Sequence, residues 1–321
     1  MTDAISADLA GRPIRVGLDV GGTKIDAVAV TPSGDIIARR RRPTGWGEEA
    51  VVSGIVGAIA DLATTGGFAP TDVGTVGVGI PGLVDADTGR VLHAVNLGVE
   101  SLDLAERAAA IVGAPVRVEN DVKAAALGAA ALRGIEGSMA YLNLGTGVAA
   151  GIVVDGAIWR GSRGTAGEVG HLSVDPNGRI CGCGQRGCIE TFCGGGALAR
   201  AWGRPGPLPV RDIFEAAESG DETAAALRSD LFHGAAAAVR ALVLSADVER
   251  VIIGGGLTAL GDRLYDGVRG ALRAGAEASP FMRSLQLDDR IELLPDGSPA
   301  AAFGAAIVGA TTPSKEIVPH G

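Results

Sequence analysis

One structural unit occurs twice in this 321-residue chain and constrains its fold more than any other feature. Residues 14–20 form an apolar run rich in β-branched side chains, which predicts a strand. A glycine-rich loop and a second predicted strand at 25–30 follow. The same order returns at residues 139–154, around Gly145-Thr146-Gly147. This repetition indicates an internal duplication, and a mass of 32.0 kDa suits two α/β lobes better than one core.

The two glycine loops are suited to holding a polyphosphate. The first loop comprises Gly21, Gly22, Thr23 and Lys24, preceded by Asp19, and the second comprises Gly145, Thr146 and Gly147. Backbone N–H groups of such loops bind phosphate oxygens without many basic side chains. Asp19, at a predicted strand end, suits a carboxylate that reaches a metal-bound water beside the phosphate. Alternatively, the loops are plain turns and Lys24 is a solvated lysine.

Residues 168–190 contain one histidine and three cysteines, and they predict a zinc site. The four residues are His171, Cys181, Cys183 and Cys188. Three thiolates and one imidazole form the ligand set of a closed structural zinc site. Gly182, Gly184 and Gly187 would let the backbone turn tightly between the sulfurs. Two carboxylates, Glu168 and Glu190, stand at the two ends of this stretch, and a bound metal would fix the direction in which they point.

The alternative to zinc is a disulfide pair. All four cysteines of the chain lie within thirteen residues, so a disulfide there would staple nothing elsewhere in the chain. That distribution favours a metal site. The remaining thiol, Cys193, is expected to be a small buried side chain.

Asp121 has two interpretations that are compatible with each other. It precedes an alanine-rich predicted helix, where an aspartate is a favoured N-cap. At a strand-to-helix junction facing a cleft, the same carboxylate could act as a general base.

A glycine triplet follows another predicted strand and comprises Gly254, Gly255 and Gly256. It either approaches a flat ring or ribose closely or forms a simple turn.

Composition argues against several other functions. The net charge of −9 and the short basic run at 39–42 argue against a nucleic-acid-binding face. Every apolar run of eighteen residues is broken by glycine or charge, which predicts no membrane span. The first dozen residues do not form a secretory signal, and they are too few for a helix-turn-helix domain. Clustered thiols without an export signal suggest a reducing cytoplasm.

Taken together, these motifs resemble the ROK family (repressors, open reading frames and sugar kinases). Residues 19–24 are similar to its first phosphate motif and residues 144–147 to its second. Glu168-x-Gly-His171 followed by Cys-x-Cys-Gly-x-x-Gly-Cys-x-Glu190 resembles its zinc signature. The resemblance covers almost the whole chain. Lys123 and Ala149 depart from the family pattern, and these departures concern substrate preference rather than the chemistry.

The resemblance implies a two-lobed actin-like fold of the hexokinase and ribonuclease-H type, with a structural zinc loop at 168–190. The expected small lobe comprises residues 1–120 and 300–321, and the large lobe comprises 121–299. The tail from residue 312 is expected to be disordered. Family members are commonly homodimers or homotetramers.

The resemblance also implies roles for individual residues in an ATP-dependent, magnesium-dependent hexose 6-kinase. Asp121 would be the catalytic base, and Asp19 would help to position magnesium. Sugar hydroxyls would be bound by Gly82, Asn120, Asp121, Glu168, His171 and Glu190. The nucleotide would be bound by the two glycine loops and by Gly254, Gly255 and Gly256.

The substrate is expected to be glucose or a related hexose, with N-acetylglucosamine or N-acetylmannosamine as alternatives. Two other classes of protein stay open. One is a non-catalytic, sugar-sensing protein related to the family's repressors. The other is a nucleotide-dependent module of the actin or chaperone type, against which the zinc motif and its carboxylates argue.

Overall fold

The computed structural model describes residues 14–311 and divides the chain into two units. Unit 1 contains the described residues up to Gly128 and those from Pro299 onward, and unit 2 contains Ala129–Ser298. The division falls inside helix α4 (Asp121–Arg133), whereas the sequence placed it just before this helix. The tail that was expected to be disordered lies outside the described residues.

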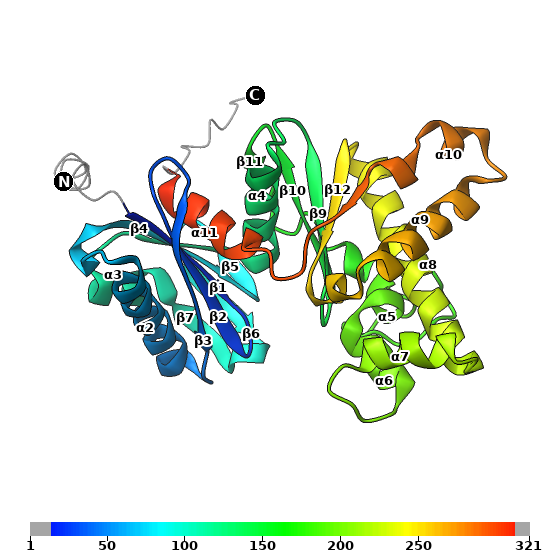
Figure 1. Ribbon diagram of the computed structural model, residues 1–321, viewed down its shortest axis with the longest axis horizontal. Coiled ribbons are helices and arrows are strands. Elements are labelled where there is room, and N and C mark those ends of the chain that lie inside the picture. Colours follow the sequence, from blue (N-terminus) through cyan, green and yellow to red (C-terminus); the bar gives the residue numbers. More distant parts are fainter. Residues whose placement is uncertain (1–13, 312–321) are drawn as a thin grey trace. The chain divides into compact units, whose positions relative to one another are not determined.

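Unit 1 is built on a five-stranded sheet with the order β3-β2-β1-β4-β8. Its strands are β1 (Ile14–Val20), β2 (Lys24–Val30), β3 (Ile36–Pro43), β4 (Val73–Ile80) and β8 (Val116–Asn120). The first three are antiparallel neighbours, and β1, β4 and β8 run parallel (Figure 1). A small antiparallel sheet of β5 (Leu83–Asp85), β6 (Arg90–Ala94) and β7 (Val99–Asp103) belongs to the same unit.

Helices cover both faces of the unit 1 sheet because alternate strand residues point to opposite sides. In β2, Ala27 and Ala29 join a core that includes α2 (Glu48–Gly66), while Val28 and Val30 pack with α11 (Ala300–Ala310). The helix α3 (Leu104–Val112) and the short 3₁₀ turns η1 (Pro70–Asp72) and η2 (Val95–Leu97) complete the unit.

Unit 2 repeats this architecture. Its sheet has the order β11-β10-β9-β12-β13, again with two antiparallel and two parallel pairings. The strands are β9 (Met139–Leu144), β10 (Val148–Val154), β11 (Ala157–Ile158), β12 (Arg250–Gly254) and β13 (Ile291–Leu293). The same order and the same strand directions confirm the duplication that the sequence predicted.

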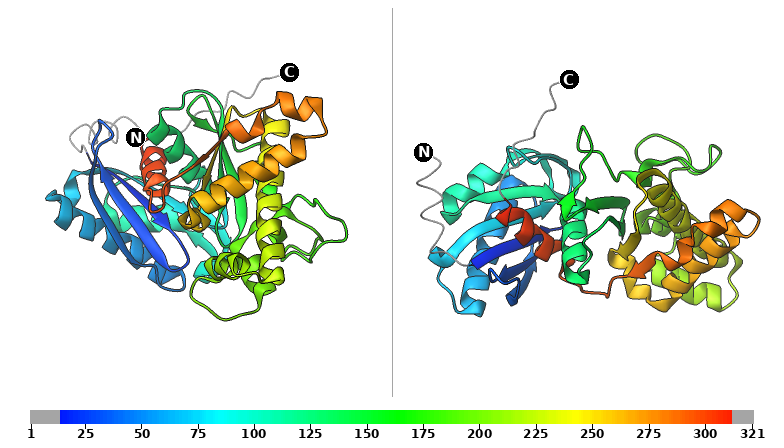
Figure 2. Two further views of the ribbon diagram at one scale, coloured as in Figure 1. Left: turned by 45° about the vertical axis from the view of Figure 1, so that its right-hand side comes forward. Right: turned by 90° about the horizontal axis from the view of Figure 1, so that it is seen from above.

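Helices form most of the rest of unit 2 (Figure 2). They are α5 (Ile189–Cys193), α6 (Gly195–Trp202), α7 (Pro209–Glu218), α8 (Glu222–Ala246), α9 (Asp262–Ala276) and α10 (Pro280–Ser284). Three 3₁₀ turns also belong to the unit: η3 (Val169–His171), η4 (Gly256–Leu260) and η5 (Leu287–Asp289). The core of the unit combines the buried residues of β9 and β10 with those of α7, α8 and α9.

Two sequence patterns predict other elements than the structure shows. The cluster of Asp85, Asp87 and Gly89 predicts a loop over residues 83–90, but these residues include β5 and the start of β6, because Val84 pairs with Val91 across a hairpin. The apolar spacing predicts two helices at 222–228 and 232–246, but the structure has one helix, α8, which continues because Leu227 and Leu231 are both buried in the unit 2 core.

Helix α2 is, among residues 14–311, the one helix long and apolar enough to cross a membrane by length and composition. Its apolar residues Val51, Ile55 and Leu62 are buried in the unit 1 core. That burial is typical of a core helix in a globular unit.

Helix α11 approaches the unit 1 sheet closely because both surfaces are made of small residues. A Cβ atom at Gly77 in β4 would collide with the backbone carbonyl of Ala305 and would lie 2.8 Å from the backbone nitrogen of Gly309. Neither neighbour is a side chain that could rotate away. Gly17 in β1 meets the backbone of the same helix in the same way.

We therefore expect Gly77→Ala to destabilise the protein by about 3 kcal/mol, because the added methyl group must separate helix from sheet. Gly270→Ala is the matched control. Gly270 lies in α9 with open space around its Cβ position, so alanine there should stabilise by up to about 1 kcal/mol. Urea unfolding of both variants measures the difference, and equal stabilities would contradict this close packing.

Candidate active site

The carboxyl ends of the three parallel strands of unit 1 gather polar residues at one edge of the sheet. Asp19 in β1 is in register with Gly79 in β4, and Ile80 is in register with Asn120 at the end of β8. Parallel strands end at the same edge, so Asp19, Asn120 and Asp121 come together there. A Cβ at Gly79 would lie 3.4 Å from the Asp121 Cα, so glycine leaves room for the start of α4.

The helix-capping role that the sequence offered to Asp121 is filled by Asn120. The Asn120 Oδ1 accepts hydrogen bonds from the backbone N–H groups of Val122 at 3.1 Å and Lys123 at 3.2 Å. This is the bonding of an N-cap residue. The Asp121 carboxylate accepts a bond from the adjacent Val122 N–H at 3.0 Å. Capping alone therefore does not account for an aspartate at position 121.

Gly82, expected to contribute backbone to the sugar site, is tied to Asn120. The Asn120 Nδ2 donates to the Gly82 carbonyl oxygen over 3.5 Å. Gly82 has a φ of 108°, and a Cβ there would lie 2.7 Å from the Leu92 carbonyl oxygen, so only glycine fits without strain. Asp19, Gly82, Asn120 and Asp121 therefore belong to one region of unit 1.

The pKa of the Asp19 carboxyl is raised from 3.8 to about 7. Burial is the largest cause, followed by the negative charges of Asp121 and Asp26. Nearby Lys24 and Arg39 lower the pKa without reversing the shift. Such a concentration of negative charge fits a bound divalent cation, which would return Asp19 to its charged form.

We expect Asp19→Asn to raise the melting temperature at pH 8 without magnesium or nucleotide. A raised carboxyl pKa means that ionisation opposes folding, and this cost grows as pH rises from 3.8 to about 7. The gain should be a few kcal/mol at most and should disappear as the pH falls to about 3, where Asp19 is protonated in both states. Thermal unfolding across this pH range measures it. An equal gain at every pH would contradict the electrostatic explanation.

The first glycine loop is held by a residue that sequence reasoning missed. The buried Thr44 donates its hydroxyl to the Gly21 carbonyl at 2.7 Å and its N–H to the Thr23 carbonyl at 3.2 Å. The Gly21 N–H closes the loop on the Lys24 carbonyl at 2.9 Å. Thr44 stands between Pro43 and Gly45, so its sequence neighbourhood indicated only a turn.

The second glycine loop is supported by the start of α6 in unit 2. The N–H groups of Gly195 and Gly196 donate to the carbonyls of Gly145 and Thr146 at 2.8 and 2.9 Å. Gly255 packs on the end of β9, because a Cβ added at Gly255 would lie 2.5 Å from the Leu144 carbonyl oxygen. The structure therefore brings the glycine triplet 254–256 next to the loop 145–147.

Glu190 joins the second glycine loop to the cysteine cluster. Its Oε2 accepts the Val148 N–H at 3.0 Å, and a Cβ at Gly147 would lie 2.6 Å from the same oxygen. The other oxygen, Oε1, lies 4.0 Å from the Cys181 Sγ. The partly exposed His171 and the exposed Glu168 lie at the two ends of the turn η3, where the His171 N–H donates to the Glu168 carbonyl at 3.2 Å.

The four predicted zinc ligands converge in unit 2. Their ligand atoms all lie within 4.8 Å of one another. Two Zn–S bonds of about 2.3 Å at a tetrahedral angle place the sulfurs about 3.8 Å apart. The Sγ atoms of Cys183 and Cys188 are 3.7 Å apart, and the His171 Nδ1 lies 3.9 Å from the Cys181 Sγ. This geometry fits a tetrahedral zinc ion, and all four cysteines of the chain are free thiols.

Backbone turns and hydrogen bonds support the cluster. Gly184 and Gly187 adopt φ angles of 92° and 65°, as the predicted tight turns require, while Gly182 does not. Hydrogen bonds from Gln185 lower the pKa of the Cys183 thiol to about 6, which favours the thiolate form that binds metal. The expectation for Cys193 is confirmed: it is fully buried, and burial raises the pKa of its thiol.

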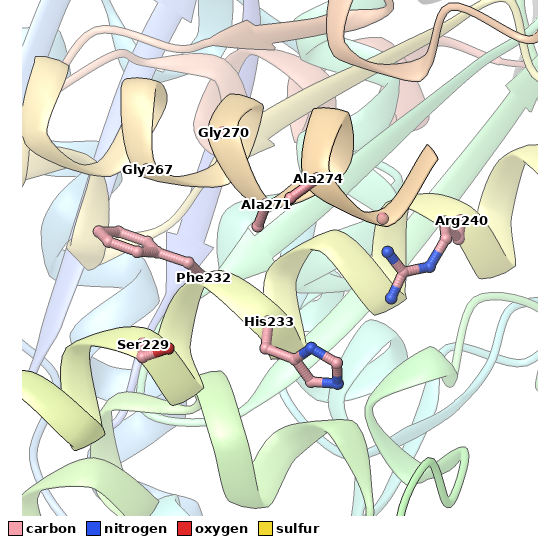
Figure 3. Close-up of a pocket in the computed structure, with 9 residues that line it drawn as sticks. Ser229, Phe232, His233, Arg240, Gly267, Gly270, Ala271 and Ala274 are labelled. Carbon is pink, nitrogen blue, oxygen red and sulfur yellow. The ribbon is translucent and has the colours of Figure 1, made fainter. Parts of the chain in front are cut away.

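A pocket of 590 Å³ between α8 and α9 in unit 2 is separate from all these residues. Figure 3 shows Phe232, His233 and Arg240 opposite Ala271 and Ala274. The described residues that line it include none of the expected site residues, so the candidate active site does not extend there.

Comparisons with known proteins identify a matching family and similar chains. The model of the ROK family matches residues 15–308. A glucokinase from Halalkalibacterium halodurans is 32% identical over 275 residues, covering 79% of this chain and 83% of that protein. An N-acetylmannosamine kinase from Haemophilus influenzae is 34% identical over 248 residues, covering 75% and 79% of the two chains.

A solved structure is also similar. It is a ROK family glucokinase from Streptomyces griseus in complex with glucose and AMPPNP, with a TM-score of 0.75 and 30% identity. The match covers 92% of this chain and 99% of that chain.

Proposed function

The chain belongs to the ROK family, and from this premise we propose that it is a sugar kinase that transfers the γ-phosphoryl group of ATP to the 6-hydroxyl of glucose or a related hexose. The observation that carries the proposal is the meeting of Asp19, Asn120 and Asp121 at the ends of parallel strands in unit 1. AMPPNP, present with glucose in the similar Streptomyces griseus structure, is an analogue of ATP.

In this mechanism Asp121 acts as the general base. Its carboxylate takes the proton of the 6-hydroxyl as the hydroxyl oxygen attacks the γ-phosphorus in line, and ADP leaves. Asn120 fixes the start of α4, which orients Asp121, and it also holds the Gly82 backbone that would border the sugar. The N–H groups of the two glycine loops would bind phosphoryl oxygens as negative charge builds up on them.

Two metals fit residues of the chain in different roles. Asp19 would hold magnesium through a bound water, and the cation would supply positive charge beside the phosphates. His171, Cys181, Cys183 and Cys188 would hold a structural zinc through a closed ligand shell. The Nδ1 of His171 points into that cluster, so its Nε2 is the nitrogen that would reach a sugar hydroxyl.

A second candidate substrate is N-acetylmannosamine, which is favoured by the 34% identity to the Haemophilus influenzae enzyme. N-Acetylglucosamine, a homodimeric or homotetrameric assembly, a cytoplasmic location and the absence of nucleic-acid binding stay predictions.

The test is coupled ADP release with ATP and magnesium against a panel of hexoses and N-acetylhexosamines. One strongly preferred sugar is expected, and its identity names the substrate. Sugar binding by calorimetry without any turnover would instead assign the protein to the sensor class. ATP hydrolysis that ignores every sugar would favour the nucleotide-dependent module.

A further inference from the structure

We propose that Trp46 is a further sugar-binding residue, and that its exposed indole packs against the apolar C–H face of the pyranose ring. This inference rests on the proposed kinase function and deepens it, because it names a contact and the chemical class of the group that makes it. Trp46 lies outside both glycine loops and outside the zinc signature.

The exposure of Trp46 is the first observation. The residue is 70% exposed, although a tryptophan buries more apolar surface than any other residue when it is covered. The backbone around it is shaped by two glycines, Gly45 and Gly47, with φ angles of 83° and 90°. The chain thus presents a large aromatic surface from a defined turn.

The second observation is that this turn is joined to the first glycine loop. Thr44 donates to the Gly21 and Thr23 carbonyls, as described above. On the other side, the Gly47 N–H donates to the Leu97 carbonyl at 2.7 Å. The turn that carries Trp46 is therefore held between the first glycine loop and the turn η2.

The third observation is the position of the indole itself. A Cβ at Gly98 would lie 2.5 Å from both the Cε2 and Nε1 atoms of Trp46, so the edge of the indole rests on the backbone of this glycine. Gly22 in the first glycine loop packs closely on Asn96, next but one to Gly98. A Cβ added at Gly22 would lie 3.0 Å from the Asn96 carbonyl oxygen. One edge of the indole therefore packs on Gly98, close in the chain to the contact between Asn96 and the first glycine loop, and most of the residue is exposed to solvent.

The segment formed by β6 and η2 also contacts Gly82, the residue that would border the sugar. Strand β6 runs directly into η2, and a Cβ at Gly82 would lie 3.2 Å from the Cα of Ala94, the last residue of β6. Gly82 is bonded to Asn120 in turn. Trp46 therefore packs on the β6–η2 segment, which also contacts Gly22 of the first glycine loop and Gly82, the residue that would border the sugar. An aromatic ring is suited to the C–H face of a sugar, whose hydroxyls point outward to polar partners.

Steady-state kinetics of Trp46→Ala and Trp46→Phe tests this inference. With Trp46→Ala we expect the KM for the preferred sugar to rise about tenfold, while the KM for ATP stays within about twofold. Trp46→Phe should restore most of the loss because it keeps an aromatic face. Trp159→Ala, which removes another exposed tryptophan from unit 2, is the matched control and should change neither constant.

Fluorescence titration with the sugar alone gives a second readout. We expect the sugar-induced change in tryptophan emission in the parent protein to be lost in Trp46→Phe. An unchanged sugar KM and an unchanged emission response in the variants would overturn the inference. A rise confined to the KM for ATP would assign the indole to the nucleotide and overturn it as well.

The same experiments separate this inference from the proposed function. Failure of the parent protein to phosphorylate any sugar contradicts the kinase proposal, whereas normal kinetics in Trp46→Ala contradicts only the role of Trp46. If the parent binds sugar without turnover, calorimetric affinities of the parent and Trp46→Ala decide the inference, and equal affinities overturn it. A parent that binds no sugar overturns both.

Discussion

Replacing Asp121 with asparagine is expected to lower sugar-dependent turnover by about 10³-fold, within the range that a positioned general base contributes. The amide cannot accept the proton of the attacking hydroxyl. The fold should survive because the cap of α4 is made by Asn120, whose hydrogen bonds to the Val122 and Lys123 N–H groups do not involve the Asp121 side chain.

Three measurements on Asp121→Asn separate chemistry from binding and folding. Turnover should fall, calorimetric sugar affinity should stay near that of the parent, and the melting temperature should not drop. It should even rise slightly at pH 8, because the Asp121 charge is one cause of the raised pKa of Asp19. Asp87→Asn makes the same chemical change in an exposed turn of unit 1 and should leave turnover unchanged. Near-normal turnover in Asp121→Asn would refute the assignment of the base.

Replacing Cys181 with alanine is expected to remove zinc and to weaken sugar binding together. A site with three of its four ligands loses its closed shell, and zinc content should fall from about one ion per chain to near zero. The effect should reach the sugar because His171 is both a cluster member and an expected sugar ligand, and Glu190 lies between the Cys181 Sγ and the second glycine loop. A loss of about tenfold or more in sugar affinity is expected, as is typical when support of a metal site is removed.

Metal analysis and calorimetry on the purified protein check this expectation. Cys193→Ala is the matched control from the same stretch of chain. Its buried thiol donates to the Ile189 carbonyl, so the variant should keep zinc and sugar affinity while losing about 1 kcal/mol of stability. A zinc-free Cys181→Ala protein with intact sugar affinity would disprove the positioning role. Absence of zinc from the parent would disprove the site itself.

The sequence by itself determined the elements whose signals are local. Strand β1 has the predicted bounds because residues 14–20 are an apolar run rich in β-branched side chains, closed by the first glycine loop. The zinc ligands were also predictable, because ligand type and spacing along a glycine-rich loop restrict the possible chemistry to very few alternatives.

Only the tertiary structure decided the features that depend on contacts between distant segments. Asn120 rather than Asp121 caps α4, because the cap depends on side-chain geometry that two adjacent polar residues do not reveal. Thr44 holds the first glycine loop from 20 residues or more away in the chain, and no local pattern distinguishes it from an ordinary turn residue. Glu190 reaches the second loop in the same way, with one oxygen bound to the Val148 N–H. Hydrogen bonds of this kind form only when the sheets and helices have packed, so a single sequence carries the residues but not their partners.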